Sequence, residues 1–111
     1  MSPGAMWRKE SLSGGGAFRR VLRRGRRIRR EGLTLYFHER HGPTHVGLIV
    51  ALSPRSAVTR NRARRRLRSA ARLAVPASGW DVVIRADRSA ITLDFQEMVR
   101  DMAVAVGEAA A

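Results

Sequence analysis

The sequence predicts an α+β fold, a sandwich in which helices pack on a β-sheet. Three segments place apolar residues every three or four positions, as amphipathic helices do: 17–24, 57–73 and 93–106. Three other segments alternate apolar and polar residues or are almost continuously apolar, as strands are: 33–38, 45–52 and 80–86. A chain of 111 residues is expected to form one domain, which we place at residues 17–107.

The first element is predicted to be a short helix that follows a flexible segment. Residues 1–16 end in the glycine run SGGG, which is typical of a flexible chain. Phe18, Val21 and Leu22 then lie at helical spacing. Gly25 is well placed to end this helix.

Two strands are expected next. Apolar and polar residues alternate through 33–38, with Thr34 and Tyr36 on the more polar face. Segment 45–52 is almost continuously apolar and rich in branched side chains, which favours a central strand. The sequence RHGP between them is typical of a turn. The two strands are therefore predicted to pair as an antiparallel hairpin.

The most basic segment is predicted to be a helix from residue 57 to about 73, with Ser56 as its N-cap. Its apolar stripe consists of Ala63, Leu67, Ala70, Ala71 and Ala74. Its opposite side consists of Asn61, Arg64, Arg65, Arg68 and Arg72, with Arg62 also on the polar side and Arg60 and Arg66 flanking the apolar stripe. Because alanine is small, the inner face of this helix can lie close against a sheet.

A third strand over 80–86 and a last helix over about 93–106 complete the predicted elements. Trp80, Val82 and Ile84 share one face of the strand. Thr92 or Asp94 is the expected N-cap of the helix.

The charge of the chain predicts a polyanionic partner. The formal net charge is +13, and 21 of the 22 basic residues are arginine. Residues 8–72 hold 19 basic and 3 acidic residues, whereas residues 73–111 hold 3 basic and 6 acidic. The partner should therefore contact the first two-thirds of the chain. Arginine favours bidentate contacts with phosphate and stacking on bases.

The absence of cysteine fits a reducing compartment. No apolar run approaches the roughly 20 residues that span a bilayer, and the N-terminus lacks the apolar core of a secretory signal. A cytoplasmic protein without a membrane role is the expectation.

The stretch AVTRNRARRRLR, residues 57–68, resembles the Arg-Asn-Arg signature of the bacterial ribonuclease P protein component. Other stretches resemble the same family in the same order: GAFRRVLRRGRR, LTLYF, VGLIVA, GWDVVIRA and DFQEMVRDM. The resemblance covers about residues 10–106. It implies a ribonuclease P protein-like fold, shared with a ribosomal protein domain: a two-layer sandwich of a central, mostly antiparallel sheet with three helices and a left-handed βαβ crossover.

The resemblance also implies a function. The chain would be the protein subunit of ribonuclease P, which binds a catalytic RNA and supports removal of the 5′ leader from precursor tRNA. Mg²⁺ held mainly by the RNA would drive the cleavage, and no obligate protein partner is expected. The residues implied to bind the catalytic RNA are Arg55, Arg60, Asn61, Arg62, Arg64, Arg65, Arg68 and Arg72. Those implied to bind the leader are Phe18, Leu22, Thr34 and Tyr36, where an aromatic ring can stack on a base.

The chain itself shows no pattern for catalysis. It has no cysteine nucleophile, no phosphate-binding loop with its lysine, and no Ser-His-Asp order. His38, His41 and His45 are interpreted as a solvated hairpin rather than a metal site.

Three other functions remain open from the residues alone. A structural RNA-binding protein of ribosomal type shares the charge and size of this chain. A DNA-binding helix would need a preceding helix where a strand is predicted. Membrane binding is disfavoured because the apolar face of the basic helix is mostly alanine.

Overall fold

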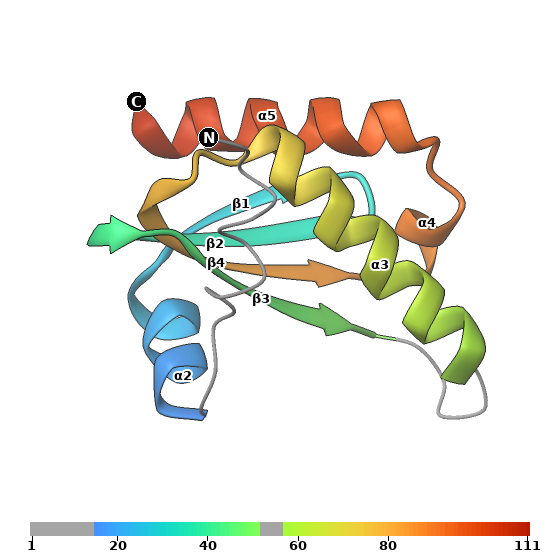
Figure 1. The fold of residues 1–111 in the computed structure, drawn as a ribbon, viewed down its shortest axis with the longest axis horizontal. Helices are drawn as coiled ribbons and strands as arrows, with labels where there is room; N and C mark the ends of the chain where they lie inside the picture. The colour runs from blue at the N-terminus through green and yellow to red at the C-terminus, as the bar shows by residue number, and fades with distance from the viewer. Residues whose placement is uncertain (1–14, 52–56) are drawn as a thin grey trace.

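The computed structural model describes residues 15–51 and 57–111, which form four helices and four strands (Figure 1). The helices are α2 (Gly15–Arg24), α3 (Ala57–Ala74), α4 (Arg88–Ile91) and α5 (Phe95–Ala110). The strands are β1 (Arg26–Arg30), β2 (Leu33–Pro43), β3 (His45–Val50) and β4 (Ser78–Ala86). The three long helices were predicted, whereas β1 and the single-turn helix α4 were not. Gly15 and Gly16, which were expected to belong to a flexible segment, are the first residues of α2.

The strands form one sheet in the order β1-β2-β4-β3. β1 pairs with β2 and β2 with β4, both antiparallel, and only β3 and β4 are parallel. The mostly antiparallel sheet is therefore confirmed.

The hairpin predicted between segments 33–38 and 45–52 is wrong, because β4 lies between β2 and β3. Only Thr44 separates the two strands, which is too short for a hairpin turn. Instead, Pro43 pairs with Ser78, and the Thr44 amide donates to the Ala77 carbonyl at 2.9 Å. The edge of β2 is thus taken by a strand that lies more than thirty residues later in the chain.

The crossover from β3 through α3 to β4 is left-handed, as the resemblance implied. In Figure 1 both strands run to the right, β4 lies above β3, and α3 crosses in front of the sheet. Parallel strands are almost always joined in the right-handed sense. The periodicity of the sequence gives no indication of this exception.

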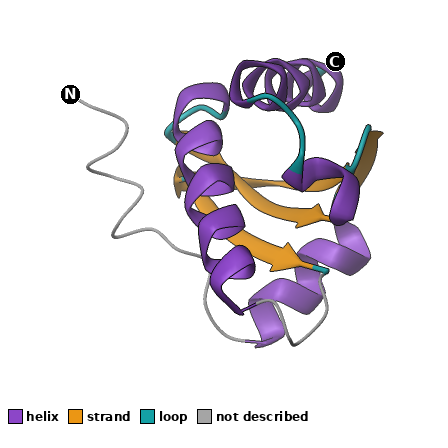
Figure 2. Cartoon of the chain, turned by 90° about the vertical axis from the view of Figure 1, so that its right-hand side faces the viewer, coloured by secondary structure: helices purple, strands orange, loops and turns teal. Residues whose placement is uncertain are grey.

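The helices cover the two faces of the sheet unequally, with α3 and α5 on one face and α2 on the other (Figure 2). The main core lies under α3 and α5. Its largest fully buried side chains include Leu33, Leu35, Leu67, Ile84, Met98 and Met102. The alternation within β2 placed its leucines here correctly.

The apolar stripe predicted for the basic helix is confirmed. Ala63, Leu67, Ala70 and Ala71 are all buried, and Ala74 packs against the same core. Asp94 caps α5, since its carboxylate accepts a hydrogen bond from the Gln96 amide at 3.1 Å. The predicted cap of α3, Ser56, lies outside the described residues.

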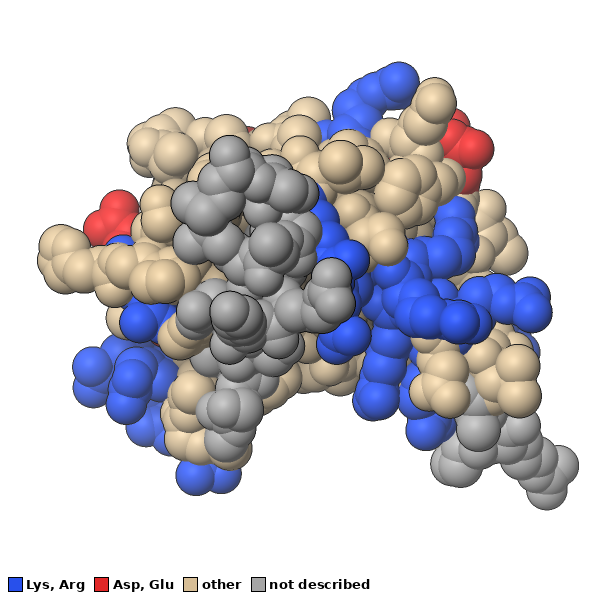
Figure 3. All heavy atoms as spheres, in the orientation of Figure 1, with Lys and Arg blue, Asp and Glu red and all other residues tan. Residues whose placement is uncertain are grey.

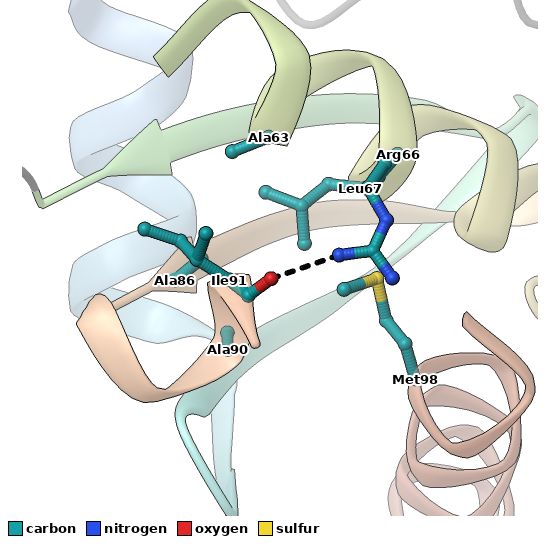
Figure 4. Close-up of a pocket in the computed structure, with 7 residues that line it drawn as sticks. All are labelled: Ala63, Arg66, Leu67, Ala86, Ala90, Ile91 and Met98. Carbon is teal, nitrogen blue, oxygen red and sulfur yellow. Dashed lines mark hydrogen bonds between the residues drawn. The ribbon is translucent and has the colours of Figure 1, made fainter. Parts of the chain in front are cut away.

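Arg66 differs from its neighbours on α3 because its guanidinium group turns toward the body of the protein (Figure 4). It donates to the Ile91 carbonyl at 3.0 Å and to the Leu93 carbonyl at 2.7 Å. These carbonyls lie at the end of α4 and in the link to α5, so Arg66 ties three helices together. Below it lies an apolar pocket of about 10 Å³, enough for about one water, lined in part by Ala63, Leu67 and Met98.

We expect Arg66→Ala to destabilise the fold by about 2 kcal/mol, because it leaves two half-buried carbonyls without their donor. The midpoint of urea unfolding measures this loss. Arg65→Ala, which removes an exposed arginine from the next position, is the matched control and should change stability by less than about 0.5 kcal/mol. Equal midpoints for the two variants would contradict a structural role for Arg66.

Candidate nucleic-acid interface

The outer face of α3 is a continuous basic surface. Asn61, Arg62, Arg64, Arg65 and Arg68 are all exposed, as predicted. Four of them, together with Val58, line an open hollow along the helix: Asn61, Arg64, Arg65 and Arg68. Figure 3 shows the corresponding group of arginine side chains on the right of the molecule, over α3. We call this the α3 surface.

Two predicted members of the α3 surface are less exposed than the others. Arg60 and Arg72 are half-buried, so they combine contact with the protein body and access to solvent. Arg55 lies outside the described residues. Thus five of the eight predicted residues are exposed on α3, and two more are half-buried.

The charge of the α3 surface is not neutralised by the protein. Helix α3 contains no acidic residue. In the part of the chain that the structure describes, Arg62, Arg64, Arg65 and Arg68 form no ion pair. Their mutual repulsion disfavours the free protein, and a polyanion relieves it.

Aromatic side chains meet on the opposite face of the sheet, beneath α2. Phe18 of α2 and Tyr36 of β2 are both half-buried and pack in one cluster with Val21 and Val83. The Phe18 ring lies directly on Gly47 of β3, where an added Cβ would come within 2.4 Å of the ring. Because Gly47 has no side chain, the Phe18 ring can pack against the sheet at this position. The sequence analysis did not predict this role of Gly47.

The other two residues implied for leader binding flank this aromatic pair. Thr34 is half-buried and lies two residues before Tyr36, on the same face of β2. Leu22 of α2 is 38 % exposed. We call the set of Phe18, Leu22, Thr34 and Tyr36 the α2 groove, a name that stands for the leader-binding site implied by the resemblance.

A second basic surface lies on the outer side of α2, and the sequence interpretation did not assign it. Arg19, Arg20, Arg23 and Arg24, with Gly16, line another open hollow. In Figure 3 arginine side chains gather at the lower left, in the position of α2. The helical spacing of Phe18 and Val21 was the available signal, because it places these arginines on the opposite side.

Two of the three histidines, His38 and His45, belong to a polar cluster at one end of the sheet, whereas His41 is exposed. The Arg40 guanidinium group contacts the His45 ring and donates to Asp81 Oδ1 at 3.3 Å. His45 Nδ1 lies 3.5 Å from the same oxygen, and His38 pairs with Asp81 in the strand register. Among the residues that the structure describes, no three potential ligands are grouped so as to hold a metal ion.

No helix within residues 15–51 or 57–111 is long and apolar enough to cross a membrane.

Comparison with known proteins gives a consistent result. A protein family described as Ribonuclease P matches residues 6–110. A ribonuclease P protein component of Acidothermus cellulolyticus is 40% identical over 90 residues, which cover 76% of this chain and 74% of the relative. One from a Nocardioides species is 37% identical over 100 residues, covering 82% and 83%.

Solved structures share the fold. The ribonuclease P protein of Thermotoga maritima superposes with a TM-score of 0.73 at 18% identity, covering 89% of this chain and 96% of the other. A mutant ribonuclease P protein of Staphylococcus aureus, described as defective in mRNA degradation, gives a TM-score of 0.76 at 16% identity, covering 96% and 93%. At these identities the likeness concerns the arrangement of the chain.

Proposed function

Because this chain belongs to the ribonuclease P protein component family, we propose that its α3 surface binds the ribonuclease P RNA and that its α2 groove binds the 5′ leader of precursor tRNA. The chain is the protein subunit of a ribonucleoprotein endoribonuclease and works with the ribonuclease P RNA. The assignment of each surface to one RNA is the proposed part.

The unneutralised α3 surface is the observation that carries the proposal. Arg64, Arg65 and Arg68 project from one rigid helix that is held to the sheet by buried alanine and leucine. Guanidinium groups in fixed register suit a folded RNA, whose phosphates are also fixed, and each phosphate contact releases condensed counterions. RNA binding of this kind depends on shape and charge rather than on base sequence.

The α2 groove offers a different kind of contact. Phe18 and Tyr36 are only half-buried, so part of each ring remains available to a base. Stacking of a base on an aromatic side chain contributes about 1–3 kcal/mol and tolerates any sequence. A precursor has a leader and mature tRNA has none. A groove that binds the leader therefore favours substrate over product.

Mg²⁺, the metal expected for this cleavage, does not fit either surface of the protein. The α3 surface and the α2 groove present guanidinium groups, an amide, a hydroxyl and aromatic rings. Mg²⁺ takes oxygen ligands such as carboxylates and phosphates. We therefore assign the metal mainly to phosphates of the RNA partner, and the protein's part is to bind and orient RNA.

Reconstitution tests the proposal. The purified full chain is mixed with a bacterial ribonuclease P RNA, and cleavage of a precursor tRNA is followed at limiting Mg²⁺. We expect the protein to accelerate cleavage and to lower the Mg²⁺ concentration that the reaction needs, because its arginines neutralise phosphates that would otherwise need cations. RNA binding without any effect on cleavage would contradict the proposal and favour a purely structural RNA-binding protein.

A further inference from the structure

Strand β1 divides its four arginines between the two faces of the sheet. Arg26 donates to the Ala111 carbonyl at 3.1 Å, and Arg30 forms ion pairs with Asp101 at 3.1 Å and Glu108 at 3.8 Å. These two arginines therefore fasten β1 to α5.

Arg27 and Arg29 alternate with them and lie on the other face, which carries α2. Both are exposed, and neither forms an ion pair with any residue in the described ranges. Thus two of the four arginines in β1 are bound to α5 and its C-terminal end, and the other two form no ion pair with the described residues.

The strand register places the two free arginines beside the α2 groove. Arg27 pairs with Tyr36 and Arg29 with Thr34. On the far side of β2, Thr34 pairs with Arg85 of β4, which is also exposed. Directly opposed residues on one face have Cβ atoms about 4.5–5.5 Å apart. Thr34 therefore lies between two guanidinium side chains, and Tyr36 has a third beside it.

This part of the sheet face is not covered by α2. The helix packs on Tyr36, Val83 and Gly47, where burial is greatest. One row further along the strands, Arg29 and Arg85 are exposed.

No carboxylate of the described residues forms an ion pair with Arg27, Arg29 or Arg85. Asp87, two residues after Arg85, accepts a hydrogen bond from the Ser89 amide, and Asp81 is engaged by Arg40 and His45. Glu31, two residues after Arg29, is exposed. A polyanion that enters the α2 groove would meet the three guanidinium groups without displacing an existing ion pair.

We propose that Arg27, Arg29 and Arg85 form a phosphate-binding floor in the α2 groove, which holds the sugar-phosphate backbone of the leader while Phe18 and Tyr36 contact its bases. This inference rests on the proposed function of the groove. Arg27 and Arg29 are two residues apart, about 6.6 Å along the strand, so each can bind a different phosphate of an extended chain. Guanidinium groups bind phosphate in a bidentate manner, and such contacts do not depend on the identity of the base. The floor can therefore bind leaders of any sequence.

The test compares two double variants of the full chain, each assembled with ribonuclease P RNA. Arg29→Gln/Arg85→Gln removes two charges from the floor. Arg88→Gln/Arg100→Gln removes two exposed arginines from other parts of the surface and is the matched control. Affinity for precursor tRNA and for mature tRNA is measured over a series of salt concentrations.

We expect the floor variant to bind precursor tRNA about tenfold more weakly. Its slope of log affinity against log salt should become less steep by about 1.4, the contribution of two single-strand phosphates. Its affinity for mature tRNA and for the ribonuclease P RNA should not change, and the control variant should match the wild type. An equal loss for precursor and mature tRNA would overturn the inference and assign these arginines to another RNA segment.

A second measurement uses a leader with neutral methylphosphonate linkages. The wild-type complex should bind this precursor more weakly than the natural one, whereas the floor variant should show little further loss. Additive losses would overturn the inference. If Tyr36→Ala weakens binding of precursor tRNA more than binding of mature tRNA and the floor variant does not, the phosphate-binding floor is refuted but leader binding by the groove is not. If neither variant weakens precursor binding selectively, the proposal that the α2 groove binds the leader is refuted.

Discussion

Replacing Arg64, Arg65 and Arg68 together by glutamine is expected to weaken binding of the ribonuclease P RNA about 100-fold at moderate salt. Three charge-assisted contacts of roughly 1 kcal/mol each give this factor. All three side chains are exposed and form no ion pair with the described residues, so the substitutions should not lower the stability of the fold. The measurement is the dissociation constant of the protein–RNA complex over a series of salt concentrations.

The salt dependence distinguishes direct phosphate contacts from general attraction. Each phosphate neutralised in a duplex contributes about 0.9 to the slope of log affinity against log salt, so the triple variant should lose between about 2 and 3 of that slope. A control that replaces Arg23, Arg88 and Arg100 lowers the net charge equally from other parts of the surface. Equal losses in both triple variants would mean that net charge, and not the α3 surface, determines binding.

Tyr36→Ala is expected to weaken binding of precursor tRNA to the assembled enzyme by at least about fivefold, while binding of mature tRNA stays the same. The physical reason is the loss of one stacking contact, which contributes about 1–3 kcal/mol. Tyr36 also packs beside Val21 and Val83, so the unfolding midpoint must be measured for the same variant.

Tyr36→Phe is the matched control, because it keeps the ring and removes only the hydroxyl group. It should retain most of the affinity for precursor tRNA. A loss with Tyr36→Phe as large as with Tyr36→Ala would assign the effect to the hydroxyl rather than to stacking. If Tyr36→Ala weakened binding of mature tRNA equally, the result would contradict a contact between Tyr36 and the leader.

Much of this fold could be predicted from local patterns. Apolar spacing located α2, α3 and α5, and alternation correctly put Leu33 and Leu35 in the core and Tyr36 on the other face. These predictions succeed because a helix or strand must bury one side. The apolar residues of that side therefore recur along the sequence with the period of the helix or strand.

Strand β1 escaped prediction because only Ile28 of its five residues is apolar. Its Arg30 is stabilised by ion pairs with partners that are distant in sequence, Asp101 and Glu108. The false hairpin has a related cause: β4 enters between β2 and β3 from far along the chain. Local periodicity does not specify which strand becomes the neighbour of another.

The candidate surfaces were also only partly predictable. The helical wheel brought Asn61, Arg64 and Arg68 together because one element carries them all. The position of Gly47 under Phe18, and of Arg85 beside Thr34, depends on the pairing of strands. Residues that come to one surface from three different strands have no regular spacing in the sequence, so a sequence pattern cannot identify them.

The left-handed crossover has a mechanical consequence. Helix α3 packs on one face of the sheet through Leu67, Ala70 and Ala71, and β3 and β4 present Gly47, Val83 and Arg85 to the opposite face. The α3 surface and the α2 groove are therefore supported by opposite faces of one sheet. Under the function proposed for these two surfaces, the thickness of the sheet sets the separation between the bound ribozyme and the bound leader. The proposal then implies that this separation determines where along the substrate the ribozyme's reactive centre lies.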